Sequence, residues 1–149
     1  MLPPDFKDFL KLLNAKQVEY LLIGGYAVGY HGYPRVTGDI DIWVAISPSN
    51  AEKIVEVLRK YGFGVPELCA DLFLEENRII RMGYPPMRVE ITTGVSGVNF
   101  AECFSERVIT VIDEIEVNII NLHHLKINKK ASGRLKDLID LENLPDSVP

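Results

Sequence analysis

Apolar residues recur with two different periods along the chain, one typical of helices and one typical of strands. The order of these segments predicts the fold class. Apolar residues recur every three to four positions, as in an amphipathic helix, over residues 5–16, 51–60, 122–131 and 134–144. Short apolar or alternating runs typical of strands cover residues 18–23, 39–46, 78–82, 87–92, 107–112 and 115–120. Shorter helical turns are expected at 26–33 and 99–105, and Asp5 is a plausible cap for the first helix.

Two pairs of strands are close enough in sequence to form antiparallel hairpins. A glycine–proline turn at 83–86 joins the strands 78–82 and 87–92, and Asp113-Glu114 joins 107–112 to 115–120. Hairpins mixed with helices, without strict strand–helix alternation, indicate an α+β protein whose mixed, mainly antiparallel sheet is flanked by helices. No repeat or linker divides the chain, so we expect a single domain over residues 1–149, with the helices of 122–144 packed on it.

Composition narrows the possible environments and partners. A net charge of −5 argues against a surface that coats nucleic acid, although a local basic patch is compatible with it. Cys69 and Cys103 form no CxxC pair and lie beside apolar residues, which predicts buried free thiols. The longest apolar run, residues 20–30, is too short to cross a bilayer, and the N-terminus has no basic region of a secretory signal. A soluble, cytoplasmic protein without a membrane partner is expected.

The stretch with the clearest chemistry is Thr37-Gly38-Asp39-Ile40-Asp41. Alternation along a strand places Asp39 and Asp41 on one face, with Cα atoms roughly 6–7 Å apart. Two like charges so close resist ionisation unless a cation lies between them, and Mg²⁺ prefers such carboxylate ligands. The alternative is an ordinary strand with a solvated, acidic edge.

Two further features could complete a site around these aspartates. Gly24-Gly25 follows a strand, where glycines would let a phosphate approach the backbone, although such a pair is often only a tight turn. Glu90 lies on the polar face of the alternating run 87–92 and would join the aspartates if the two strands are neighbours. Three carboxylates around Mg²⁺ suit phosphoryl or nucleotidyl transfer, and Glu90 could alternatively serve as a general base.

Together, the glycine pair, Arg35-x-Thr37-x-Asp39-x-Asp41 and a later acid resemble the DNA-polymerase-beta-like nucleotidyltransferase superfamily. A narrower resemblance is to small bacterial proteins related to the AbiEii-type toxins of toxin–antitoxin systems. The resemblance implies that Asp39, Asp41 and Glu90 hold Mg²⁺, for which Mn²⁺ could substitute, and that Gly24 and Gly25 contact a nucleoside triphosphate. Arg35 could then hold a phosphate and Thr37 could orient the turn.

Cations are concentrated near the C-terminus of this acidic protein, at Lys126, Lys129, Lys130, Arg134 and Lys136. Such a cluster could simply be a solvated face. By resemblance to the related toxins, Lys126 is expected to reach the nucleotide, with Lys129 as a second candidate. Asp137 and Asp140 are expected to pair with neighbouring cations. His31 is expected to pack or cap, and no role is assigned to the two adjacent histidines 123 and 124.

The leading hypothesis is a Mg²⁺-dependent nucleotidyltransferase that moves a nucleoside monophosphate to a tRNA, a protein or a small molecule. Such an enzyme could be the toxin of a toxin–antitoxin pair. A second hypothesis is a catalytically silent domain that binds a nucleotide or a partner, such as an antitoxin or a helical protein. Dinucleotide binding by a Rossmann unit is disfavoured because the glycines fall at 24, 25 and 29, without the G-x-G-x-x-G spacing.

Overall fold

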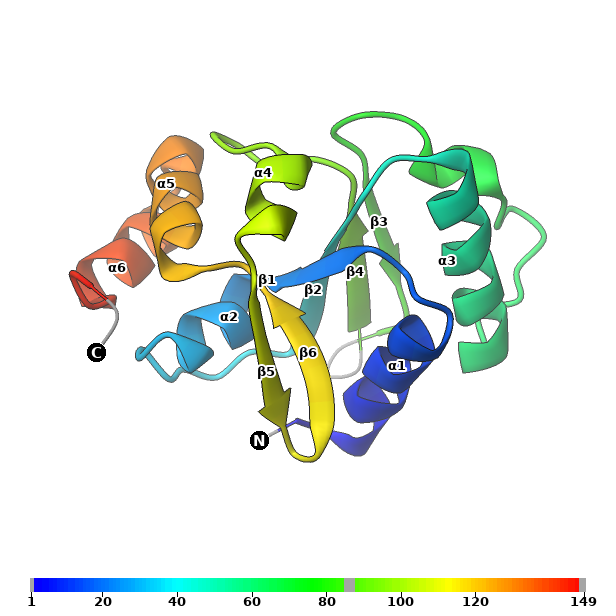
Figure 1. Ribbon diagram of the computed structural model, residues 1–149, viewed down its shortest axis with the longest axis horizontal. Helices are drawn as coiled ribbons and strands as arrows, with labels where there is room; N and C mark the ends of the chain where they lie inside the picture. The colour runs from blue at the N-terminus through cyan, green and yellow to red at the C-terminus, as the bar shows by residue number, and fades with distance from the viewer. Residues whose placement is uncertain (1, 85–87, 148–149) are drawn as a thin grey trace.

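The computed structural model describes residues 2–84 and 88–147, which form six α-helices, one 3₁₀ turn and a six-stranded sheet (Figure 1). The helices are α1 (Pro4–Ala15), α2 (Gly24–Tyr30), α3 (Pro48–Tyr61), α4 (Phe100–Ser105), α5 (Leu122–Ser132) and α6 (Leu135–Asn143), with the 3₁₀ turn η1 at Ala70–Phe73. The strands are β1 (Tyr20–Ile23), β2 (Asp39–Val44), β3 (Ile79–Met82), β4 (Arg88–Thr92), β5 (Val108–Ile112) and β6 (Ile115–Ile119).

The sheet has the strand order β3-β4-β2-β1-β6-β5. The hairpins β3–β4 and β5–β6 are antiparallel, as is β1–β2, whereas β2–β4 and β1–β6 are parallel. The α+β class with a mixed, mainly antiparallel sheet is therefore confirmed. The parallel β2–β4 pairing is the one that matters for the site, because it joins two strands that are far apart in sequence.

Local sequence signals explain where several helices begin and end. The Ser47 hydroxyl accepts a hydrogen bond from the Asn50 amide at 3.1 Å, and Gly62 ends α3 in the left-handed conformation with φ of +116°. Asn121 caps α5 in the same way, since its side chain accepts a hydrogen bond from the His124 amide. The expected cap of α1 is wrong: Pro3 occupies the cap position and Asp5 lies inside the first turn, because Pro4 can start a helix without an amide donor.

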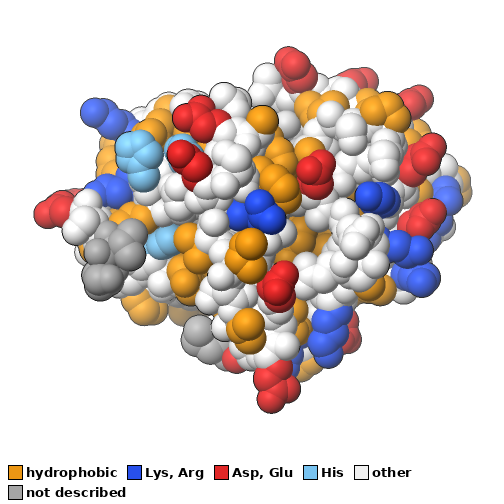
Figure 2. All heavy atoms as spheres, viewed as in Figure 1, with side chains coloured by type: hydrophobic (Ala, Val, Ile, Leu, Met, Phe, Trp, Pro, Cys, Tyr) orange, Lys and Arg blue, Asp and Glu red, His pale blue; other side chains and the backbone are white. Residues whose placement is uncertain are grey.

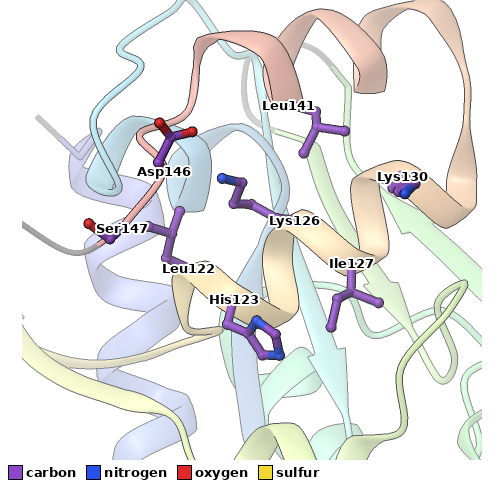
Figure 3. Close-up of a pocket in the computed structure, with 8 residues that line it drawn as sticks. All are labelled: Leu122, His123, Lys126, Ile127, Lys130, Leu141, Asp146 and Ser147. Carbon is purple, nitrogen blue, oxygen red and sulfur yellow. The ribbon is translucent and has the colours of Figure 1, made fainter.

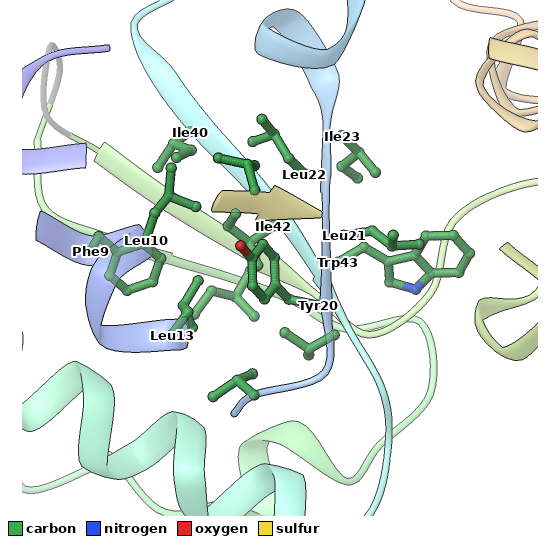
Figure 4. Packing of buried hydrophobic residues seen from close by; sticks show 14 of the residues in the cluster. Phe9, Leu10, Leu13, Tyr20, Leu21, Leu22, Ile23, Ile40, Ile42 and Trp43 are labelled. Carbon is green, nitrogen blue, oxygen red and sulfur yellow. The ribbon is translucent and has the colours of Figure 1, made fainter. Parts of the chain in front are cut away.

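The core lies between the sheet and the helices α1 and α3, which pack against each other at the right of Figure 1. All four residues of β1 are buried, and α1 contributes Phe9, Leu10 and Leu13 to the same cluster (Figure 4). Ile40 and Ile42 of β2 are fully buried there too. Burial on this face of β2 is what turns its alternate side chains, the two aspartates, in the opposite direction.

The last helix, α6, is not oriented as its apolar pattern predicts. Leu135 is 77% exposed, and Leu138 and Ile139 are also exposed, whereas Asp137 and Asp140 are almost completely buried. Ion pairs made by the two aspartates, described below, hold this orientation. In the outer face shown in Figure 2, charged side chains of both signs are scattered among apolar ones.

Three smaller expectations can also be compared with the structure. Cys103 is buried but Cys69 is exposed, so the expectation of two buried thiols is half wrong. Pro85 and Pro86 of the predicted turn, and Met87 of the predicted strand, lie outside the described residues. Among the residues described, no helix is both long and apolar enough to cross a membrane.

Candidate functional site

Three carboxylates from two strands line the same cleft. β2 and β4 run parallel with Asp41 directly opposite Glu90. Because Ile40 and Ile42 point into the core, Asp39 and Asp41 point to the other side of the sheet. All three acids, which we call the carboxylate cluster, border a cleft of about 560 Å³. The structure therefore brings together the three acids that the sequence singled out.

The carboxylate cluster is only partly balanced by cations. Arg88 donates to Oδ2 of Asp39 from Nη2 at 2.8 Å and from Nε at 3.2 Å, and Arg81 Nε donates to Oε2 of Glu90 at 3.1 Å. Burial, followed by repulsion from Glu90 and Asp39, raises the pKa of Asp41 to about 7. A half-buried acid that resists ionisation beside two other acids is the environment that a bound cation relieves.

The glycine pair at the start of α2 allows β2 and the loop before it to approach closely. Gly24 has a φ of +68°, and a Cβ there would overlap the Asp41 carboxylate. A Cβ on Gly25 would lie 2.7 Å from the Thr37 hydroxyl oxygen. Both glycines and Thr37 border the cleft, so glycine is required at both positions because a side chain there would clash with the site.

Arg35 and Thr37 both border the cleft but are engaged by other residues. The Arg35 guanidinium binds Asp140 in bidentate fashion, from Nε at 2.8 Å and Nη2 at 2.9 Å. The Thr37 hydroxyl donates to the Asp39 carbonyl oxygen at 3.3 Å. Thr37 thus stabilises the turn that leads into β2, in line with the orienting role expected for it.

A buried ion-pair network joins α5, α6 and the Arg35 loop. Lys129 Nζ lies 3.2 Å from Asp137 Oδ1 and 3.0 Å from Asp140 Oδ2, and Arg134 Nε donates to Asp137 Oδ2 at 2.8 Å. With the Arg35–Asp140 pair, these five residues form what we call the helix-pair network. The expectation that Asp137 and Asp140 pair with neighbouring cations is confirmed.

The structure places Lys126 away from the carboxylate cluster. Lys126 borders a second hollow, between α5 and the C-terminal segment, where Nζ donates to the Pro145 carbonyl oxygen at 3.0 Å (Figure 3). Successive helix residues are rotated by about 100°, so Lys126 and Lys130 share this side while Lys129 points about 60° the other way. Lys129 is the α5 lysine that borders the cleft.

Arg81 and Arg88 are site residues that the sequence reasoning missed. The signal was present in the alternation of β4, which puts Arg88 and Glu90 on one face. Their partners could be assigned only after β4 was known to lie between β2 and β3.

Comparisons with known proteins agree with this geometry. Residues 5–145 match the family described as nucleotidyltransferase of unknown function (DUF6036). No curated protein matches the sequence. The narrower resemblance to AbiEii-type toxins stays a prediction.

Two solved structures share the fold. A candidate nucleotidyltransferase from Thermotoga maritima has a TM-score of 0.59 at 14% identity, over 95% of this chain and 93% of that one. An antigenic nucleotidyltransferase-like protein from Paracoccidioides brasiliensis has a TM-score of 0.55 at 16% identity, over 92% of this chain and 72% of that one. At such low identity these likenesses show the fold alone. The family match spans nearly the whole chain, and the protein therefore belongs to the nucleotidyltransferase family DUF6036.

Proposed function

We propose that the protein is a Mg²⁺-dependent nucleotidyltransferase, which moves a nucleoside monophosphate from a nucleoside triphosphate to a hydroxyl or phosphate group of an acceptor. The observation that carries the proposal is the parallel register of β2 and β4, which sets Asp39, Asp41 and Glu90 along one cleft. Membership of a nucleotidyltransferase family supports the same class of reaction.

The carboxylate cluster has the chemistry that a Mg²⁺ site requires. Its donors are hard carboxylate oxygens, and the pKa of Asp41 is raised first by burial and then by the negative charges of Glu90 and Asp39. Asp39 and Asp41 would hold the ion, with Glu90 as the third ligand. Bound Mg²⁺, or Mn²⁺ in its place, would neutralise and orient the triphosphate during in-line displacement.

Glu90 has a second possible role in proton transfer. Arg81 engages only Oε2 of Glu90, so Oε1 can face an acceptor. A carboxylate in that position could take the proton from an attacking hydroxyl as a general base. The half-buried setting of Glu90 limits the water that would compete for this proton.

Other groups that border the cleft could serve the phosphates. Gly24 and Gly25, which lie against the carboxylate cluster, would contact a triphosphate, and Lys136, followed by Lys129, supplies positive charge that partly offsets the raised pKa of Asp41. Arg35 can reach a phosphate only by exchanging its Asp140 partner. Because Lys126 lies in the second hollow, we assign the cations beside the carboxylate cluster to Lys136 and Lys129, of which Lys129 is already paired with Asp137 and Asp140.

The acceptor, the cytoplasmic location and any antitoxin or helical partner stay predictions from the sequence. A first test supplies the purified protein with Mg²⁺, each labelled nucleoside triphosphate, total cellular RNA and protein extract. Label should pass to one acceptor fraction with the unmodified protein, and should be lost with Asp39→Asn plus Asp41→Asn. The matched control is Asp5→Asn plus Asp8→Asn, two exposed aspartates of α1, which should leave the transfer unchanged. Absence of labelled product with every nucleotide and acceptor would overturn the proposal.

A catalytically silent binding domain is the second candidate, and the arginine pairs favour it. Arg88 and Arg81 already satisfy two of the three carboxylates, as a structural ion pair would. Calorimetry distinguishes the two functions. Nucleotide binding with Mg²⁺ that is unaffected by Asp39→Ala plus Asp41→Ala would favour the silent domain.

A further inference from the structure

A group of metal-binding side chains lies where the end of α4 meets the start of α5, outside the cleft described above. The ligand atoms of Glu102, Glu106 and His124 all lie within 4.8 Å of one another. His124 Nε2 is 3.3 Å from Glu106 Oε2 and 4.0 Å from Glu102 Oε1. None of the three borders the cleft. Acidic and histidine side chains gather at this place on the face shown in Figure 2.

These separations suit a single tetrahedral ion. With Zn–N of about 2.0–2.1 Å and Zn–O of about 2.0–2.2 Å, neighbouring ligand atoms are about 3.3–3.5 Å apart. The shorter observed separation agrees with this spacing. The longer one requires only a small rotation of Glu102, whose side chain is 64% exposed and so free to adjust.

His124 is an unusual member of the group because it is buried. Its side chain is only 5% exposed, yet Nδ1 has no hydrogen-bond partner among the described residues. Buried imidazoles are normally hydrogen-bonded, and even the half-buried His31 has a partner, since its Nε2 lies 2.7 Å from the Ile120 carbonyl oxygen. The protein thus holds a desolvated imidazole with Nε2 directed at two carboxylates, which a metal ion would bridge.

Two asparagines hold the three residues in place. Asn121 Oδ1 accepts from the His124 amide at 2.7 Å, and Asn121 Nδ2 donates to the Glu106 carbonyl oxygen at 3.1 Å. Asn99 Nδ2 donates to Glu102 Oε2 at 3.3 Å, so Oε1 is the oxygen that faces His124. Asn99 thus orients a ligand side chain, as outer partners of metal sites do, whereas Asn121 ties the backbone of His124 to that of Glu106.

We propose that Glu102, Glu106 and His124 bind a divalent transition-metal ion of the Zn²⁺ class, which fastens α4 to α5. Imidazole nitrogen and carboxylate oxygen are both ligand types that Zn²⁺ takes, and three protein ligands would leave the fourth position to water. The imidazole favours such an ion over Mg²⁺, which takes oxygen ligands. This site is independent of the function proposed for the cleft.

The test is calorimetric titration of Zn²⁺ alone into metal-free protein that carries Asp39→Asn plus Asp41→Asn, so that the cleft does not contribute. This protein should bind one Zn²⁺, and its melting temperature should rise with Zn²⁺. Adding Glu102→Gln plus Glu106→Gln should weaken binding at least about tenfold, since losing even an outer partner of a metal site costs that much. Both glutamates are exposed, so these variants should fold.

The matched control adds Glu52→Gln plus Glu142→Gln, two exposed glutamates elsewhere, and should bind as tightly as the starting protein. A second measurement follows the ring ¹⁵N resonances of His124, which should shift when Zn²⁺ binds. The proposal is overturned if the starting protein binds no Zn²⁺, or if Glu102→Gln plus Glu106→Gln leaves the affinity and the ¹⁵N shift unchanged.

Discussion

The carboxylate cluster and the helix-pair network both contain buried or half-buried aspartates, but in opposite electrostatic states. Burial opposes ionisation of Asp137, yet hydrogen bonds from Arg134, Ser132 and Lys129 outweigh it and lower its pKa to about 2. The pKa of Asp140 is lowered against burial in the same way, chiefly by Arg35. In the carboxylate cluster burial prevails, and neighbouring acids add to it.

The difference between the two regions shows that burial alone does not decide the state of an acid. Charged donors in direct contact decide it, because a hydrogen bond from a cation stabilises the ionised form more than burial destabilises it. In the helix-pair network each aspartate is paired with cations, and these ion pairs hold the C-terminal helices in place. In the carboxylate cluster the negative charge is only partly balanced by cations, as expected of a site that receives a cation from solution.

The largest effect is expected from removing the cation at the centre of the helix-pair network. Lys129→Met leaves Asp137 and Asp140 without their shared partner and should lower the free energy of unfolding by about 3–5 kcal/mol. Lys126→Met is the matched control, since it removes one hydrogen bond to a carbonyl, and should cost about 1 kcal/mol. Urea denaturation measures both values. Equal losses would contradict the distinction between the two lysines.

In the carboxylate cluster, removing an acid should harm activity and not stability. Asp41→Asn should reduce nucleotide transfer at least about 100-fold, because a metal ligand matters at least as much as its outer partners. Its melting temperature should stay equal or rise, since the raised pKa shows that the folded state disfavours the charge. Asp140→Asn, which breaks the network, should lower the melting temperature. A similar loss of stability in both variants would contradict the proposed difference between the carboxylate cluster and the helix-pair network.

The contact between the glycine pair and the carboxylate cluster can be tested with two glycines of similar backbone conformation. Gly24→Ala and Gly133→Ala both force an alanine into a positive φ, of +68° and +67°, at about 1–2 kcal/mol each. Only the Cβ at position 24 would also overlap Asp41, whereas a Cβ at position 133 would lie at an ordinary 3.7 Å from the Lys130 carbonyl oxygen. Gly24→Ala should therefore cost about 1–3 kcal/mol more in chemical denaturation, as overpacking does. Equal costs would mean that Asp41 moves aside freely.

The smallest effect concerns the loss of folding stability at low pH. The pKa of Asp137 in the folded protein, about 2, lies below its ordinary value of 3.8, so its contribution is present above pH 4 and is lost as the pH falls toward 2. This contribution is about 2 kcal/mol. Comparing Asp137→Asn with the unmodified protein at pH 5 and pH 2.5 should show a weaker pH dependence in the variant. If the pH dependence of stability were the same in the variant, groups other than Asp137 would cause the loss of stability in acid.

Much of the fold was predictable because its signals are local. Ser47-Pro48 and Gly62 mark the two ends of α3, and the alternation of residues 88–92 marks β4. The two hairpins follow from short turns between alternating runs. The alternation of Asp39 and Asp41 with buried isoleucines was likewise sufficient to place both acids on one face.

Other features depended on contacts between distant segments. The apolar pattern of α6 did not predict its orientation, since Leu135 is exposed and Asp137 is buried. His124 had no visible partner in sequence, because Glu106 is 18 residues away and approaches it only when α4 and α5 meet. Lys126 and Lys129 are equivalent as charges in the sequence, and the rotation of α5 about its axis separates them.

The sequence by itself determined the α+β class, the two hairpins and the residue types of the carboxylate cluster, because turns, caps and alternation act over a few residues. Only the tertiary structure decided that β4 pairs with β2, which arginines pair with Asp39 and Glu90, and which lysines border the cleft. Those outcomes depend on strand order and helix rotation, which are set by packing of the whole core and by charge pairs between residues distant in the chain.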